Sequence, residues 1–208
     1  MTTSAHAAIA AYVRDVLSHI PRISSDRQRI EDDLRAHLIE RIKAGDTPAA
    51  AMAAMGNPQA VAESYLGERT LHYAPLGLRF LAALVDFMVL SVGWITPIAM
   101  FWWLISRESS GWWGLGVVIM AVSLWALASM IYFPVAEAVF GQTIGKRLFG
   151  LAVVTESGLA IGAKEAILRR IPYLFHMAIM LDAIFVFFGQ KHQRVFDHVA
   201  GTVVVEAS

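Results

Sequence analysis

The chain contains no cysteine among its 208 residues, and this absence excludes several kinds of chemistry. Without thiols there is no disulfide bridge, no thiolate nucleophile and no cysteine-ligated metal site. Charge is scarce as well, because Asp, Glu, Lys and Arg make up 16% of the chain and cancel to a formal net charge of zero. A neutral chain lacks the basic surface by which proteins bind nucleic acid, so we expect no nucleic-acid partner.

Motifs of enzymes and of resident cofactors are also missing from the sequence. No glycine-rich phosphate loop, HExxH zinc motif or serine-nucleophile elbow occurs. His192 and His198 lie six positions apart in a loop, without further ligands at metal spacing. We therefore expect a protein that is not an enzyme and that has no cofactor and no metal site.

Long apolar runs are what the sequence has in abundance, with 57% hydrophobic residues. Residues 76–105 and 112–140 are each long enough to cross a bilayer, for which about 20 apolar residues suffice. Between them lies one short polar loop. Tryptophan pairs stand on both sides of that loop, as is typical of a membrane–water interface: Trp102, Trp103, Trp112 and Trp113. We predict an α-helical hairpin that spans the membrane.

The distribution of positive charge predicts how this hairpin is oriented. The loop at its tip holds only Arg107, whereas Lys146, Arg147, Lys164 and the pair at 169–170 follow the second run. By the positive-inside rule the segment after the second run is cytoplasmic. The N-terminus lacks a basic region followed by an apolar core, so we expect no cleaved signal peptide and a cytoplasmic N-terminus.

A third apolar run, residues 167–188, either crosses the membrane or bends back as a re-entrant segment. Two β-branched stretches, residues 148–154 and 202–205, read as short strands that require each other as partners. They pair only if both lie on the same side of the membrane. Pairing and positive charge favour the re-entrant alternative, with a cytoplasmic β-pair and a cytoplasmic C-terminus, over a third full crossing.

Residues 1–70 are predicted to form a small cytoplasmic bundle of four short helices. The first is expected at residues 3–18, and Ser25 with Gln28 has the spacing of a capping box for the second. Thr47 and Asn57 each precede a proline and are expected to cap the third and fourth helices. The second helix carries one narrow apolar stripe: Ile30, Leu34, Leu38 and Ile42.

This N-terminal part resembles HAAS-type domains, which are related to the DUF1700 family. The resemblance rests on Pro21, on Asp33-Leu34 followed by His37, and on Gly56-Asn57-Pro58. It implies a bacterial source and a cytoplasmic module for signalling or regulation, with a protein partner of its own.

Ionisable residues inside the apolar runs are the candidates for function. Arg79 and Asp86 lie in the first run, Glu137 ends the second, and Asp182 lies in the third. A carboxylate at bilayer depth costs roughly 2.5 kcal/mol or more unless it is paired or faces a polar cavity. Seven residues are close to two helical turns, so we expect Arg79 and Asp86 on one helix face, either as a structural pair or as part of a translocation or head-group site.

Three motifs in the second part of the chain resemble the RDD family, named for one arginine and two aspartates. The first runs from Arg79 to Asp86, and the last is Asp197 followed by Ala-Gly-Thr and a valine run. By this resemblance Arg79, Asp86 and Asp197 are the name residues. The central motif reads GQTIGKR and adds candidate site or lipid-facing residues: Gly141, Gln142, Thr143, Gly145, Lys146 and Arg147.

Together these observations predict an all-α, polytopic membrane protein of a bacterial inner membrane. Residues 1–70 form the HAAS-like domain and residues 76–205 the RDD membrane domain. The resemblance implies transport of an ion or small solute through the charged intramembrane site, including cation/proton exchange. The alternative is a non-transporting adaptor, or a signalling or lipid-sensing protein that acts through its N-terminal domain. Membrane lipids are expected partners, and a pathway in so small a domain favours a homo-oligomer.

Overall fold

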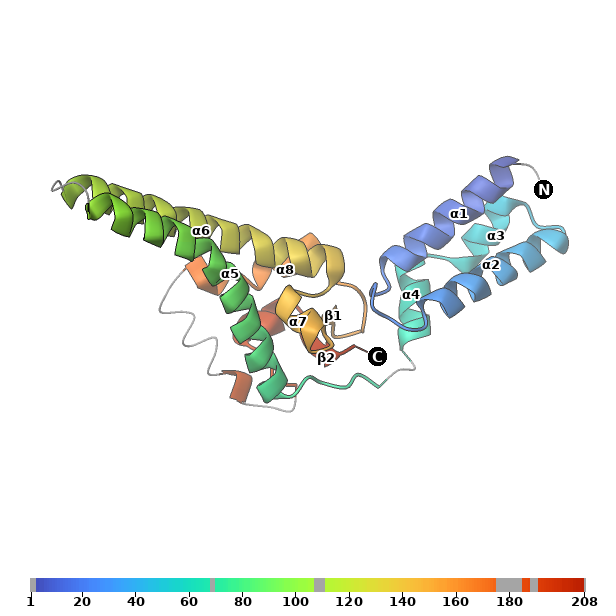
Figure 1. Cartoon of the computed structure of the whole chain (residues 1–208). Helices are drawn as coiled ribbons and strands as arrows, with labels where there is room; N and C mark the ends of the chain where they lie inside the picture. Colours follow the sequence, from blue (N-terminus) through green and yellow to red (C-terminus); the bar gives the residue numbers. More distant parts are fainter. Residues whose placement is uncertain (1–2, 68–69, 107–110, 175–184, 188–190, 208) are drawn as a thin grey trace.

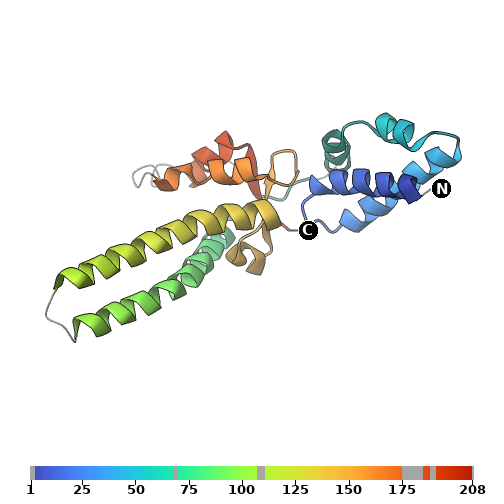
Figure 2. The same ribbon diagram turned by 90° about the horizontal axis from the view of Figure 1, so that it is seen from above.

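The computed structural model describes residues 3–67, 70–106, 111–174, 185–187 and 191–207. A long two-helix hairpin and a small helical bundle extend in opposite directions from a compact base (Figure 1). The view from above shows the same arrangement, with the β-pair at the base between them (Figure 2). The hairpin is formed by α5 (Leu76–Ile105) and α6 (Gly111–Phe140).

The N-terminal bundle has the four helices that the sequence predicts. These are α1 (Thr3–Ser18), α2 (Arg27–Lys43), α3 (Pro48–Met55) and α4 (Pro58–Leu66). The predicted stripe of α2 is buried at Ile30, Leu34 and Leu38, and it packs against α1 and α4 in one apolar core.

Two of the three predicted caps of this bundle are confirmed. The Thr47 hydroxyl accepts a hydrogen bond from the amide of Ala50 at 3.2 Å, and the Asn57 side chain accepts one from Gln59 at 2.8 Å. The capping box at Ser25 is wrong. The amide of Arg27 donates to the Ser24 carbonyl, so a tight turn leads directly into α2 and Ser25 lies inside that turn. The N-cap position therefore falls to the next residue, without a side-chain cap bond.

Both hairpin helices are long and apolar enough to cross a membrane. Within their most apolar windows, residues 76–93 and 114–140, only 11% and 6% of the residues are buried. The core helix of a soluble protein would be mostly covered, so this exposed apolar surface indicates a membrane protein. The indole of Trp125 joins the two helices by donating to the Leu90 carbonyl at 3.2 Å.

The base contains the predicted pair of strands, β1 (Leu151–Thr155) and β2 (Thr202–Glu206). They are antiparallel, with Val153 opposite Val204. The first strand begins three residues later than predicted, because Ile144–Leu148 forms a short helix, α7, and Gly150 turns the chain with a φ of 62°. The linker after the bundle lies along the other edge of β2, where the amide of Ala74 donates to the Val204 carbonyl at 3.0 Å.

Between the strands the chain forms α8 (Ala163–Leu168), η1 (Ile171–Leu174), η2 (Phe185–Phe187) and α10 (Val195–Val199). Because β1 and β2 pair, this connection begins and ends at the same end of the hairpin. Half of the predicted third apolar segment, including Asp182, lies outside the described residues.

The turn after β1 anchors the N-terminal bundle to the base. Leu159 is 5% exposed and belongs to the apolar core of the bundle. The neighbouring amide of Ala160 donates to the His19 carbonyl at 2.8 Å. One side chain of the second domain thus completes the core of the first.

Candidate functional site

Asp86 binds the central motif rather than a cation. Its carboxylate accepts hydrogen bonds from the Thr143 hydroxyl at 2.5 Å, the Gly145 amide at 2.8 Å and the Tyr132 hydroxyl at 3.2 Å. Thr143 is also the N-cap of α7, and its hydroxyl accepts from the amide of Lys146. The carboxylate therefore lies at the start of α7, where helix amides favour negative charge.

Gly145 explains why this contact is so close. A Cβ atom placed on Gly145 would lie 2.0 Å from the carbonyl oxygen of Ala82, so the backbone of α7 rests directly on that of α5. Only glycine permits such an approach, since it has no side chain. The glycine of the Gly-Lys-Arg sequence thus brings the α7 amides within reach of Asp86.

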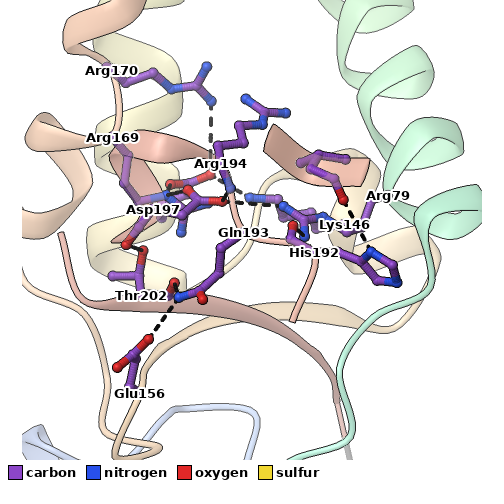
Figure 3. A network of polar contacts seen from close by, with 12 residues as sticks. Arg79, Lys146, Glu156, Arg169, Arg170, His192, Gln193, Arg194, Asp197 and Thr202 are labelled. Atoms are coloured by element: carbon purple, nitrogen blue, oxygen red, sulfur yellow. Dashed lines mark hydrogen bonds and ion pairs between the residues drawn. The ribbon is translucent and has the colours of Figure 1, made fainter. Parts of the chain in front are cut away.

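Arg79 forms its ion pair with Asp197, across a large separation in the chain. The Arg79 Nη2 to Asp197 Oδ2 distance is 3.3 Å, and Arg79 also donates to the carbonyl of His192. On its other side Asp197 contacts Arg169 at the end of α8, with 3.0 Å between Oδ1 and Nε. Two guanidinium groups from different elements therefore meet at one buried carboxylate (Figure 3).

The expected meeting of Arg79 with Asp86 is therefore wrong. Both residues line one side of α5, as their spacing predicts. Seven residues nevertheless advance about 10 Å along a helix, beyond the reach of an ion pair. Each residue instead contacts an element from the second half of the chain, α10 for Arg79 and α7 for Asp86.

Glu137, near the end of α6, is the second buried carboxylate of the cluster and is 1% exposed. Its Oε1 lies 2.5 Å from the Nζ of Lys146 and 3.9 Å from Nη2 of Arg170, and its Oε2 lies 3.7 Å from Nε of Arg169. The guanidinium of Arg170 also stacks on the ring of Phe133, 3.7 Å from its centre. Glu137 thus joins α6 to α7 and α8.

These residues surround a cavity of about 440 Å³ between the hairpin and the base. Its apolar wall comes from α5 and α6. Among the described lining residues five are cationic: Arg79, Lys146, Arg169, Arg170 and Arg194. Three lining residues are carboxylates: Asp86, Glu137 and Asp197. Among the described residues, the charged end of the cavity thus carries two positive charges in excess.

Burial and neighbouring charges shift the pKa values of the ionisable groups in the cluster. Burial lowers the pKa of the Lys146 ammonium to about 8, although the carboxylate of Glu137 opposes that shift. Burial alone would raise the pKa of Asp197. The guanidinium groups of Arg169, Arg194 and Arg79 outweigh burial and hold the pKa of that carboxyl below its ordinary value.

The remaining residues of the central motif have structural contacts. Gly141 has a φ of 70°, and its carbonyl accepts from the amide of Val153 at 2.8 Å. The Gln142 side chain donates to the Leu151 carbonyl at 2.9 Å and fixes the start of β1. Arg147 is exposed and is not among the residues that line the cavity.

Four residues that contact a predicted site residue were not themselves among the predicted ones: Tyr132, Arg169, Arg170 and Arg194. Gln193, 3% exposed, donates to the Thr202 carbonyl and to Glu156, both at 2.9 Å. Arg169 was visible as one of two adjacent arginines opening an apolar run, which is a costly place for charge unless it is paired. Within the described residues, no group of three His, Asp or Glu side chains has the geometry to hold a metal ion.

Comparison with known proteins agrees with this architecture. Neither the curated proteins nor the solved structures include one that matches the chain. The model of the RDD family matches residues 73–201, which cover the hairpin, the charged cluster and the base up to the last strand. That span is more than half of the chain, and it contains the arginine and both aspartates, so the chain belongs to the RDD family.

Proposed function

We propose that this protein acts in transport across the membrane and binds an anionic solute in the cavity at the base of its hairpin. The observation that carries the proposal is the excess of positive charge at the buried end of that cavity. Its polar end is built from side chains of α5, α6, α7, α8 and α10, so movement of the hairpin against the base would alter the site.

The same geometry disfavours exchange of a cation for a proton at Asp86. A carboxylate that exchanges its proton for a cation needs free oxygen lone pairs and a variable environment. Asp86 already accepts three hydrogen bonds, two of them from α7 and its cap. Glu137 and Asp197 are both paired with cations. An anion is the ligand that this charge balance favours.

A flux measurement with the purified full chain in lipid vesicles tests the proposal. Two readouts are taken in parallel: uptake of radiolabelled inorganic phosphate, and inward movement of a fluorescently labelled phosphatidylglycerol followed by dithionite quenching. We expect one of these to exceed empty vesicles at least tenfold, and Arg169→Gln to abolish the excess. Arg147→Gln, a neighbouring cation outside the cavity, should leave it unchanged. Rates equal to those of empty vesicles for both solutes would overturn the proposal.

An adaptor role is the second candidate, and the anchoring of the bundle favours it. The N-terminal domain resembles HAAS-type modules, and Leu159 of the RDD domain completes its core. Binding of a cytoplasmic regulator to the bundle would thereby be transmitted to β1. This candidate predicts that a photo-crosslinker at the exposed position of His37 captures a protein partner in intact cells while vesicle flux stays at background. Flux without any crosslink would count against it.

We further propose a bacterial inner-membrane location with both termini in the cytoplasm. The pairing of β1 with β2 supports a shared side for the segments that precede and follow the third apolar run. A homo-oligomer would enlarge the pathway that one hairpin lines, and crosslinking of purified protein in membranes measures it directly.

A further inference from the structure

The cavity combines a cationic end with an apolar wall that follows the membrane helices. The wall is formed on α5 by Ala83, Phe87 and Leu90, and on α6 by Trp125, Ala126 and Met130. Ala126 precedes Glu137 by eleven residues, which is about 16 Å along a helix. A ligand that filled this cavity would therefore meet charge at one end and mainly apolar side chains along its length, with the hydroxyl of Ser129 among them.

Arg169 shows where the charged end lacks a partner. Its side chain is 8% exposed, and its Nε binds Asp197, while its buried Nη1 has no hydrogen-bond acceptor among the described residues. A buried guanidinium donor needs an acceptor, and where the protein supplies none a ligand or a water molecule must do so. The other buried orphan in the cluster, Oε2 of Glu137, lies 3.7 Å from Arg169 Nε, so its charge is met.

An oxyanion satisfies both features of the charged end at once. Phosphate presents several acceptor oxygens and negative charge, and guanidinium groups bind it with matched geometry. A phosphodiester, which carries one negative charge, would neutralise one of the two positive charges in excess, and a free phosphate dianion would neutralise both. The acceptor missing at Nη1 would be supplied by one of its oxygens.

The apolar wall favours an amphiphilic ligand over a free anion. A hydrated ion would have to shed water against six apolar side chains to use this cavity, whereas an acyl chain enters from the bilayer without that cost. We propose that the cavity binds an anionic membrane phospholipid, with its phosphate at Arg169 and an acyl chain along α5 and α6. This inference rests on the proposed function and names the class of anion that the site takes.

Native mass spectrometry of the full chain, extracted from membranes of defined composition, tests the proposal. The protein is prepared with phosphatidylglycerol, with phosphatidylcholine, or with phosphatidylcholine plus inorganic phosphate, and retained ligand is counted per chain. We expect one retained phosphatidylglycerol, at least tenfold above phosphatidylcholine. Arg169→Gln should lower retention at least tenfold, and Arg147→Gln should leave it within twofold.

A second variant keeps the test decisive if Arg169→Gln fails to fold. Ala126→Trp fills the apolar wall, leaves every charge in place and is expected to lower phosphatidylglycerol retention at least tenfold. If Ala126→Trp retains the lipid as the wild type does, or if phosphatidylcholine is retained equally, the lipid proposal is overturned. Inorganic phosphate that binds the wild type and Ala126→Trp alike would assign the site to free phosphate instead.

Binding and movement are separable in these experiments. Lipid retention that depends on Arg169, without flux in vesicles, would uphold the lipid site and reject transport. Phosphate uptake without lipid retention would uphold transport and reject the lipid site.

Discussion

Arg79 and Asp197 form an ion pair across 118 positions of the chain, with 3.3 Å between Nη2 and Oδ2. The pair joins the start of the first membrane helix to the short helix that precedes the last strand. Asp197 is 2% exposed and contacts Arg169 as well. Two of the three residues that give the RDD family its name thus close the domain by holding its first and last elements together.

Removing the charge of Asp197 should destabilise this closure. Asp197→Asn keeps an oxygen for the Arg194 amide, which lies 3.2 Å away, but leaves the guanidinium groups of Arg79 and Arg169 without their carboxylate. Breaking a buried ion pair from one side costs about 3 kcal/mol. We expect a lower thermal unfolding midpoint in non-ionic detergent. Asp33→Asn, the same change at an exposed carboxylate of the bundle, should leave the midpoint unaltered.

The same carboxylate predicts a dependence of stability on acid. The pKa of Asp197 is held below its unfolded value by Arg169, Arg194 and Arg79 against the effect of burial. Its contribution to the free energy of unfolding is therefore complete above the unfolded pKa of about 4, and it is lost as the pH falls through the lower folded pKa. Unfolding midpoints recorded from pH 7 to pH 3 should fall in the wild type below pH 4 and fall less steeply in Asp197→Asn.

Glu156, which directly follows β1, also contributes to the loss of stability in acid. The hydrogen bond from Gln193, assisted by Lys191, lowers the pKa of Glu156. Because Glu156 is exposed, Glu156→Gln should change the slope below pH 4 less than Asp197→Asn does. An equal or larger change in this slope would mean that the loss of stability in acid does not come from the buried cluster.

Gly145 should tolerate no side chain. A Cβ atom there would lie 2.0 Å from the Ala82 carbonyl oxygen, so Gly145→Ala must push α7 away from α5 and stretch the bonds to Asp86. Overpacking of this kind costs about 3 kcal/mol. Gly77→Ala, in open space on α5, is the matched control and should be neutral or slightly stabilising. Equal unfolding midpoints for the two variants would show that α7 does not rest on α5.

The contributions of Asp86 and Thr143 to the free energy of unfolding should be coupled. Asp86→Asn weakens three contacts, of which the one to the Thr143 hydroxyl at 2.5 Å is the shortest. We expect Asp86→Asn to cost about 2 kcal/mol and Thr143→Val to add much less in its presence than alone, because the two share a hydrogen bond. Chemical unfolding of the four proteins of this double-mutant cycle gives the coupling. Strict additivity would contradict the proposed contact.

The sequence predicts those parts of this structure that depend on local chemistry. The apolar runs define α5 and α6, and the repeat of Ile30, Leu34 and Leu38 defines the buried face of α2, because both are helix-period patterns. The family motifs also name Arg79, Asp86 and Asp197, and all three line the cavity.

The sequence does not predict that Arg79 pairs with Asp197, because this contact joins distant segments of the chain. Spacing places Arg79 and Asp86 on one face, yet their partners lie more than forty residues away. The start of β1 is mispredicted for a related reason: Gly145 can approach α5 only as part of a helix, and this tertiary contact overrides the strand pattern of residues 148–150.

The absence of cysteine allows the cavity to be probed one position at a time. Ala83 lines the cavity one turn from Asp86, whereas its neighbour Leu84 is exposed on α5 away from that lining. In vesicles of phosphatidylcholine, Ala83→Cys should react with a membrane-impermeant thiol reagent, because the charged end of an empty cavity holds water. Leu84→Cys should stay protected by hydrocarbon. Phosphatidylglycerol should slow labelling of Ala83→Cys at least tenfold by filling the cavity. Glu206→Cys, at the end of β2, should react only from the side that we propose to be cytoplasmic. Labelling of Leu84→Cys as fast as that of Ala83→Cys would show that water reaches the whole surface of the helix. The cavity would then not be the specific site of water access.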